Sequence, residues 1–151
     1  MERTYENQPA KVDHHAYNLL KIGFIIAPIV AGLDKFFNVL TDWTQYLAPT
    51  FPELLNISSQ SFMYGVGVIE VIAGLGVALK PKIFANIVAV WLLGIIVNLF
   101  ILGGYYDIAL RDLGLSIGAF ALGQLALRHE STGEDKVKRR SRIGFHKENR
   151  V

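Results

Sequence analysis

The chain has 151 residues, of which 52% are hydrophobic and 19% are charged, and its formal net charge at pH 7 is +2. Residues 83–106 form an uncharged run of 24 positions; a run of this length can cross a bilayer as a helix, and the core of a soluble domain this small could not bury it, so the composition excludes a soluble protein. The absence of cysteine excludes disulfide scaffolds, thiolate metal sites, iron–sulfur clusters and dithiol redox chemistry carried by this chain.

Four apolar segments predict an all-α membrane protein, an antiparallel four-helix transmembrane bundle. We expect the spans at residues 19–40, 62–79, 83–102 and 107–127, so that residues 19–127 form the transmembrane domain. Pro81 predicts the turn between the second and third spans, because proline lacks the amide hydrogen that a helix interior needs. Gly103-Gly104 predicts the next turn. Residues 1–18 are a polar segment without a signal-peptide pattern, so we expect the first span to remain as an uncleaved anchor.

The placement of lysine and arginine predicts the orientation. Basic residues occur in the first 21 positions, in the turn Lys80-Pro81-Lys82 and in the tail, residues 128–151, whereas residues 41–61 and 103–106 contain none. With four spans, all the basic segments fall on one side, so both termini are predicted to face the cytoplasm. The loop 41–61 then lies outside, where Trp43 and Tyr46 indicate an interfacial cap over the bundle.

The tail differs in charge from the rest of the chain. Residues 128–151 contain eight Lys/Arg and four Asp/Glu, whereas residues 1–127 contain seven and nine. A basic tail behind a hydrophobic body indicates contact with the bilayer through anionic lipid headgroups, and not with nucleic acid. A docking strip for an acidic soluble partner is the alternative that this pattern leaves open.

Polar residues near the outer end of every span form the most informative pattern in the sequence. They are Asp34, Lys35 and Asn38 in the first span, Glu70 in the second, Asn98 in the third, and Arg111 and Asp112 in the fourth. From the rise of a helix, we expect Lys35 about 7 Å and Glu70 about 12 Å from the outer ends of their spans. Glycines one turn away, such as Gly67 beside Glu70 and Gly114 beside Arg111, indicate that the charged side chains face the bundle interior.

Two interpretations of this polar set remain open. The charges could neutralise one another as an internal ion network, since those of Asp34, Lys35, Glu70, Arg111 and Asp112 sum to −1. Alternatively, the set could line a pocket for a polar headgroup, a quinone or a proton, because ionisable groups inside a membrane span are usually functional.

The four histidines, His14, His15, His129 and His146, all lie outside the predicted spans. A buried haem with paired histidine ligands is therefore not expected. His14 and His15 could bind a metal ion at the membrane surface, but adjacent side chains on a helix do not face the same way. The sequence therefore predicts no metal site.

Three motifs resemble the pattern of the DoxX family (DoxX/DoxD-like small four-span membrane proteins). They are Gly32-Leu33-Asp34-Lys35-Phe36-Phe37, Gly67-x-x-Glu70-x-x-x-Gly74 and Arg111-Asp112, and the resemblance covers about residues 17–128. It implies a bacterial inner-membrane bundle linked to quinone-dependent oxidation, as in the small subunits of thiosulfate:quinone oxidoreductase, or to membrane assemblies with superoxide dismutase and sulfurtransferase. The dithiol chemistry of vitamin K epoxide reductase relatives in the wider superfamily cannot apply to a chain without cysteine.

Three functional hypotheses follow. The first is an accessory subunit of a quinone-linked redox or oxidative-stress system, in which the polar set holds a quinone headgroup or fixes the bundle; whether the chain itself catalyses a reaction is left open. The second is a small-molecule or lipid carrier, favoured by a kink expected at Pro28, although alternating access would require two chains because no inverted repeat is present. The third is a non-catalytic assembly factor that recruits a soluble partner through the tail. Gly114 and Gly118 would also permit pairing in a homo-oligomer.

Overall fold

The computed structural model describes residues 8–148, which form helices joined by short connections and contain no strand. The elements are α1 (Gln8–Asp34), the 3-10 helix η2 (Trp43–Tyr46), α2 (Thr50–Leu54), α3 (Ser59–Leu79), α4 (Pro81–Leu102) and α5 (Tyr106–Glu148). Within this part of the chain, four helices are long and apolar enough to cross a membrane, over His14–Asp34, Ser59–Leu79, Pro81–Leu102 and Tyr106–His129. The prediction of an all-helical chain with four candidate spans is confirmed.

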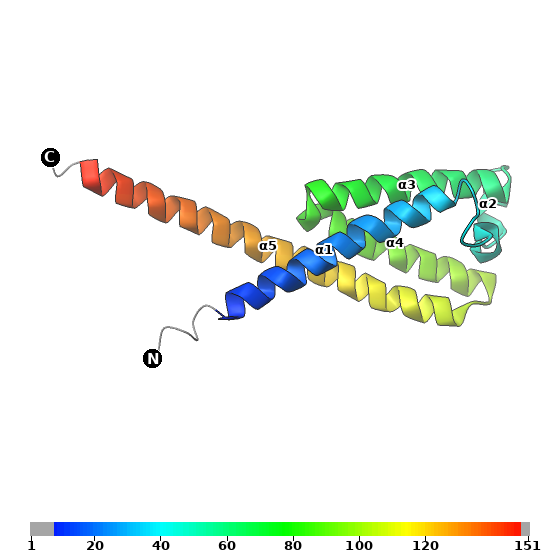
Figure 1. The fold of residues 1–151 in the computed structure, drawn as a ribbon. Coiled ribbons are helices and arrows are strands. Elements are labelled where there is room, and N and C mark those ends of the chain that lie inside the picture. The colour runs from blue at the N-terminus through cyan, green and yellow to red at the C-terminus, as the bar shows by residue number, and fades with distance from the viewer. Residues whose placement is uncertain (1–7, 149–151) are drawn as a thin grey trace.

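The long helices pack as two pairs (Figure 1). Helix α1 lies against α3 and α4 lies against α5, and less extensive contacts of α3 with α4 and of α1 with α5 join the pairs. All four helices contribute to the core, whose buried residues are Phe24, Ala73, Val77, Ala85, Val88, Ala89, Ala119 and Leu122. The start of α1 and the long C-terminal part of α5 project from one end of the molecule, whereas η2 and α2 lie at the opposite end, the cap end.

The first helix is shorter than the sequence predicts, because it ends at Asp34 and not at Leu40. Asn38 adopts a left-handed backbone conformation, with φ of 51°, and its amide donates a hydrogen bond of 2.6 Å to the carbonyl oxygen of Asp34. A residue in this conformation commonly ends a helix, and asparagine tolerates it well. The expected position of Lys35 inside the first span is therefore wrong: Lys35 is the first residue after α1.

The other span ends lie close to their predicted positions. Helices α3, α4 and α5 begin at Ser59, Pro81 and Tyr106. Helix α4 ends at Leu102, and the next residue, Gly103, has the left-handed φ of 79° that glycine adopts readily. Helix α5 runs without a break through the predicted start of the tail, and α1 begins within the expected N-terminal segment. The side chains of residues 130–151 lie outside the described part of the chain, so lipid contact by the tail remains a prediction.

Helices α1 and α3 touch at a pair of glycines. A Cβ atom on Gly32 would lie 2.6 Å from the carbonyl oxygen of Gly67, and one on Gly67 would lie 2.5 Å from the carbonyl oxygen of Gly32. Such close approach of two backbones requires residues without side chains. Lys35 and Glu70 each follow their glycine by three residues, so the crossing brings these two side chains to the same level.

Candidate functional site

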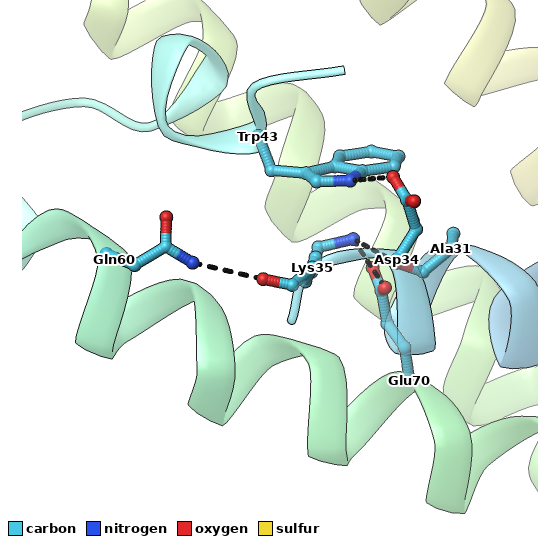
Figure 2. A network of polar contacts seen from close by, with 6 residues as sticks. All are labelled: Ala31, Asp34, Lys35, Trp43, Gln60 and Glu70. Atoms are coloured by element: carbon cyan, nitrogen blue, oxygen red, sulfur yellow. Dashed lines mark hydrogen bonds and ion pairs between the residues drawn. The ribbon is translucent and has the colours of Figure 1, made fainter. Parts of the chain in front are cut away.

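The candidate site is a buried ion pair between the end of α1 and the middle of α3. Lys35 Nζ lies 2.6 Å from Glu70 Oε2, and the two residues expose only 3% and 7% of their surface. The ammonium also lies 3.4 Å from the carbonyl oxygen of Ala31 and 3.7 Å from the centre of a Trp43 ring. An ammonium over an indole face is attracted by the ring electrons, most strongly away from water. A carboxylate, a carbonyl and an aromatic ring therefore surround this cation (Figure 2).

Gln60, in the first turn of α3, fixes the backbone of Lys35. Its Nε2 donates to the carbonyl oxygen of Lys35 at 3.0 Å, and its Oε1 accepts from Asn38 Nδ2 at 3.1 Å. Lys35 consequently lies along α3, with its carbonyl at Gln60 and its ammonium at Glu70 (Figure 2). The predicted site residue Asn38 acts here by ending α1 and by supporting Gln60, and not as a partner of the ion pair.

Asp34 holds the segment between α1 and α2, residues 35–49, over the ion pair. We call this segment the cap segment. Its Oδ2 accepts a hydrogen bond of 2.8 Å from Trp43 Nε1, and the same carboxylate accepts the backbone amides of Val39 and Leu40. These donors satisfy a carboxylate that is buried at the end of a helix, where an unpartnered charge would be costly. Asp34 therefore positions the indole that covers Lys35.

The helix that carries Trp43 has its own N-terminal cap. The carboxylate of Asp42 accepts the hydroxyl of Thr44 at 2.6 Å and the amide of Thr44 at 3.0 Å. These two hydrogen bonds hold the pKa of Asp42 below its ordinary value, because they stabilise the ionised form. The bond from the hydroxyl has the larger effect, followed by the bond from the amide. Asp42 thus fixes the start of η2, the four-residue helix in which Trp43 is the first residue.

Arg111 and Asp112 face different directions. The side chain of Asp112 is 8% exposed, whereas that of Arg111 is 66% exposed and reaches back so that Nε lies 3.4 Å from Asp112 Oδ1. Neighbouring helical side chains point about 100° apart, so both could not face the interior. The buried face of Asp112 continues to Ser116, whose hydroxyl donates to the carbonyl of Ala89. The expectation that Arg111 faces the interior is therefore wrong. Gly114, on which that expectation relied, has open space where a Cβ atom would lie, so no other helix packs closely against it.

Asp112 extends the charged cluster to α5. It lies near enough to Lys35 and Glu70 for their charges to interact. The buried set therefore contains one ammonium, that of Lys35, and three carboxylates, those of Asp34, Glu70 and Asp112. Lys35 pairs with Glu70, and the exposed guanidinium of Arg111 contacts Asp112. Four of the predicted site residues, Asp34, Lys35, Glu70 and Asp112, are thus buried at or beside the ion pair, whereas Arg111 is largely exposed.

The seventh predicted residue, Asn98, fastens the cap segment to α4. Its Oδ1 accepts the amide of Ala48 at 2.9 Å and its Nδ2 donates to the carbonyl of Tyr46 at 2.6 Å. Ala48 is fully buried, so water does not reach its amide, and the side chain of Asn98 is the acceptor that satisfies it. Asn98 therefore acts on the same end of the molecule as the ion pair, but through the loop that carries Trp43.

Replacing Asn98 by leucine should destabilise the protein by about 1–3 kcal/mol, because it leaves a buried amide without an acceptor. Amide hydrogen exchange over residues 43–48 should rise most. The matched control is Asn18→Leu, which changes an exposed asparagine on α1 and should leave both the exchange and the stability unchanged. Equal exchange over 43–48 in wild type and Asn98→Leu would contradict the assigned role.

Sequence reasoning missed Gln60 and assigned Trp43 only to the membrane interface. Gln60 precedes the predicted start of the second span and therefore belongs to the predicted loop. Trp43 reaches Lys35 because the chain turns sharply after Asp34, and nothing in the spacing of these residues reveals that turn. A polar residue just before an apolar span, such as Gln60, is the signal that could have been used.

No family model matches the chain, and neither a curated protein nor a solved structure matches it. The resemblance of the three motifs to the DoxX family therefore remains a prediction.

Proposed function

We propose that this chain is a multi-pass protein of a bacterial inner membrane, an accessory subunit of a quinone-linked redox or oxidative-stress system whose ion pair holds a quinone headgroup. Its four spans would be antiparallel, with both termini in the cytoplasm. The Lys80–Lys82 turn and the projecting ends of α1 and α5 lie at one end of the molecule (Figure 1). Residues 36–58, which lie at the cap end, contain no lysine or arginine. This segregation of basic residues supports the orientation.

The surroundings of Lys35 are the observation that carries the quinone proposal. Its ammonium is held between the carboxylate of Glu70 and the flat face of Trp43. A quinone headgroup is a planar ring with two carbonyl acceptors, so it could take the place of the indole and accept a hydrogen bond from the ammonium. Trp43 lies on the short helix η2 and not on a span, so this exchange would require movement of the loop alone.

Aromatic side chains at the cap end support the same ligand class. The rings of Trp43 and Tyr46 lie 6.2 Å apart between centres, and those of Tyr46 and Tyr105 lie 4.9 Å apart, both pairs edge to face. Tryptophan and tyrosine prefer the boundary between hydrocarbon and water. A quinone with its tail in lipid would present its headgroup at this boundary, next to the ring that covers Lys35.

The absence of cysteine from the sequence supports the accessory role. Without cysteine the chain cannot carry electrons by dithiol chemistry, so we assign the redox centre to a partner subunit. The basic tail, residues 128–151, would contact anionic lipid or this partner at the cytoplasmic face.

Fluorescence of Trp43 tests the quinone site directly. The chain contains two tryptophans, so Trp91→Phe leaves Trp43 as the sole reporter. Because Trp91 lies beside Glu70, every protein compared carries this substitution. In nanodiscs, a short-chain ubiquinone or menaquinone analogue should quench this emission saturably. In Lys35→Met/Glu70→Leu, which removes both charges together, binding should weaken about tenfold or more, the value of one hydrogen bond to a charged group.

The matched control is Lys21→Met, which removes a lysine of α1 away from the ion pair and should bind as the Trp91→Phe protein does. Quenching that rises linearly with quinone and is equal in all variants would reflect partition into lipid, and it would contradict the proposed site.

A further inference from the structure

Two histidines distant in sequence meet near the end from which the termini project. His14 Nδ1 in α1 lies 3.3 Å from His129 Nε2 in α5, and the two residues are 115 positions apart. Their ring centres lie 4.4 Å apart with the planes inclined by 49°. Tyr17, one turn after His14, also packs its ring 4.4 Å from that of His129. We propose that His14 and His129 bind one divalent transition-metal ion of the zinc or copper type and so clasp α1 to α5.

The separation of the nitrogens suits two ligands of one ion. Imidazole nitrogens lie about 2.0–2.1 Å from zinc, so two of them at tetrahedral angles are about 3.3 Å apart. The observed distance between His14 Nδ1 and His129 Nε2 equals this value. Without metal, the two nitrogens can share one proton as donor and acceptor. The ion would replace that proton, because both ligands must be neutral imidazoles with free lone pairs.

The remaining coordination positions are open. Among the described residues, no group of three histidine, cysteine, aspartate or glutamate side chains could hold a metal. Water or a further side chain would complete the coordination shell. His14 is exposed and His129 is partly exposed, so an ion reaches them from solvent. Imidazole ligands favour zinc, copper and nickel, whereas magnesium and calcium require oxygen.

The position of the pair gives the ion a structural effect. Contacts between α1 and α5 are less extensive than those within the pairs α1/α3 and α4/α5, so a bridge here strengthens a weak contact. Beyond His129, α5 continues to Glu148 and carries the basic tail away from the bundle. A metal ion at this position would fix the place where the tail-bearing helix leaves α1, independently of any quinone site.

Sequence reasoning compared His14 only with its neighbour His15, because histidines 115 positions apart have no detectable relation in one sequence. Adjacent helical residues diverge, whereas the crossing of α1 and α5 makes His14 and His129 converge. This difference provides the matched control, since His15 has the same chemistry, the same helix and a similar exposure.

Zinc titration of the full chain tests the proposal. The protein is purified without a polyhistidine tag, carries His146→Gln to remove a competing ligand in the tail, and is placed in nanodiscs of phosphatidylcholine. We expect one zinc ion per chain. His14→Gln and His129→Gln should each weaken binding at least about tenfold. The loss in the double variant should be smaller than the sum of the two single losses, because either single variant already breaks the bridge. His15→Gln should bind as the parent does.

Copper provides a second measurement that does not depend on affinity. Electron paramagnetic resonance of bound Cu²⁺ should show two imidazole nitrogens in the parent protein and one in each single variant. Absence of zinc binding at millimolar concentration would overturn the proposal. So would equal losses in His15→Gln and His14→Gln, or an unchanged copper spectrum in His129→Gln.

Discussion

The Lys35→Met variant should be about 3–5 kcal/mol less stable than the wild type, because it leaves the buried carboxylate of Glu70 without its cation. The variant also loses the contact between the ammonium and the Trp43 ring. Reversible unfolding in mixed micelles of a mild detergent and dodecyl sulfate, followed by circular dichroism, measures the difference. The loss should exceed that of any surface charge, because solvent cannot screen a pair at this depth.

Two controls separate the ion pair from a general loss of packing. Lys35→Met/Glu70→Leu removes both charges and should recover most of the stability, since apolar side chains often replace a buried pair without loss. Lys80→Met removes an exposed cation in the turn between α3 and α4, away from the buried carboxylates, and should change the stability by at most about 1 kcal/mol. A double variant as unstable as Lys35→Met alone would contradict the ion pair as the source of the effect.

The same double variant decides between the two interpretations of the polar set. An internal ion network predicts that a stable, uncharged replacement keeps every property of the protein. A quinone site predicts that the replacement folds but loses binding, because the donor on Lys35 is gone. The two interpretations share residues, and only a variant that restores stability without restoring charge distinguishes them.

The helices could be predicted because their signals are local. Apolar runs long enough to span a bilayer set the positions of α3 and α4 within three residues, and Pro81 and Gly103 mark the turns by their own backbone chemistry. These features depend on a few neighbouring residues and not on the rest of the fold.

The remainder depends on contacts between distant segments. The end of α1 is set by Asn38 and by a carboxylate that accepts amides five and six residues later, so an apolar run through Leu40 is misleading. The burial of Asp112 and the exposure of Arg111 follow from which face of α5 meets α4, and apolar residues on all sides of a helix do not reveal that face. Trp43 reaches Lys35 only through the resulting turn.

The close approach of α1 and α3 at Gly32 and Gly67 predicts a large loss of stability when either glycine gains a side chain. Gly32→Ala and Gly67→Ala should each destabilise the protein by about 3 kcal/mol, because the added methyl group would overlap a backbone carbonyl of the other helix. A side chain can rotate away from such an overlap, but a carbonyl in a helix cannot, so the helices must separate. That separation acts on Lys35 and Glu70, which lie one turn further along.

Gly65→Ala is the matched control, since Gly65 is on α3 two residues from Gly67 and nothing lies within 4 Å of its added Cβ. It should leave stability unchanged or raise it by up to about 1 kcal/mol, because alanine favours the helix. Unfolding curves of all three variants give the comparison, and in Gly32→Ala the saturable quenching of Trp43 by quinone should weaken together with stability. If Gly67→Ala were as stable as Gly65→Ala, the backbone contact could not be what sets the distance between Lys35 and Glu70.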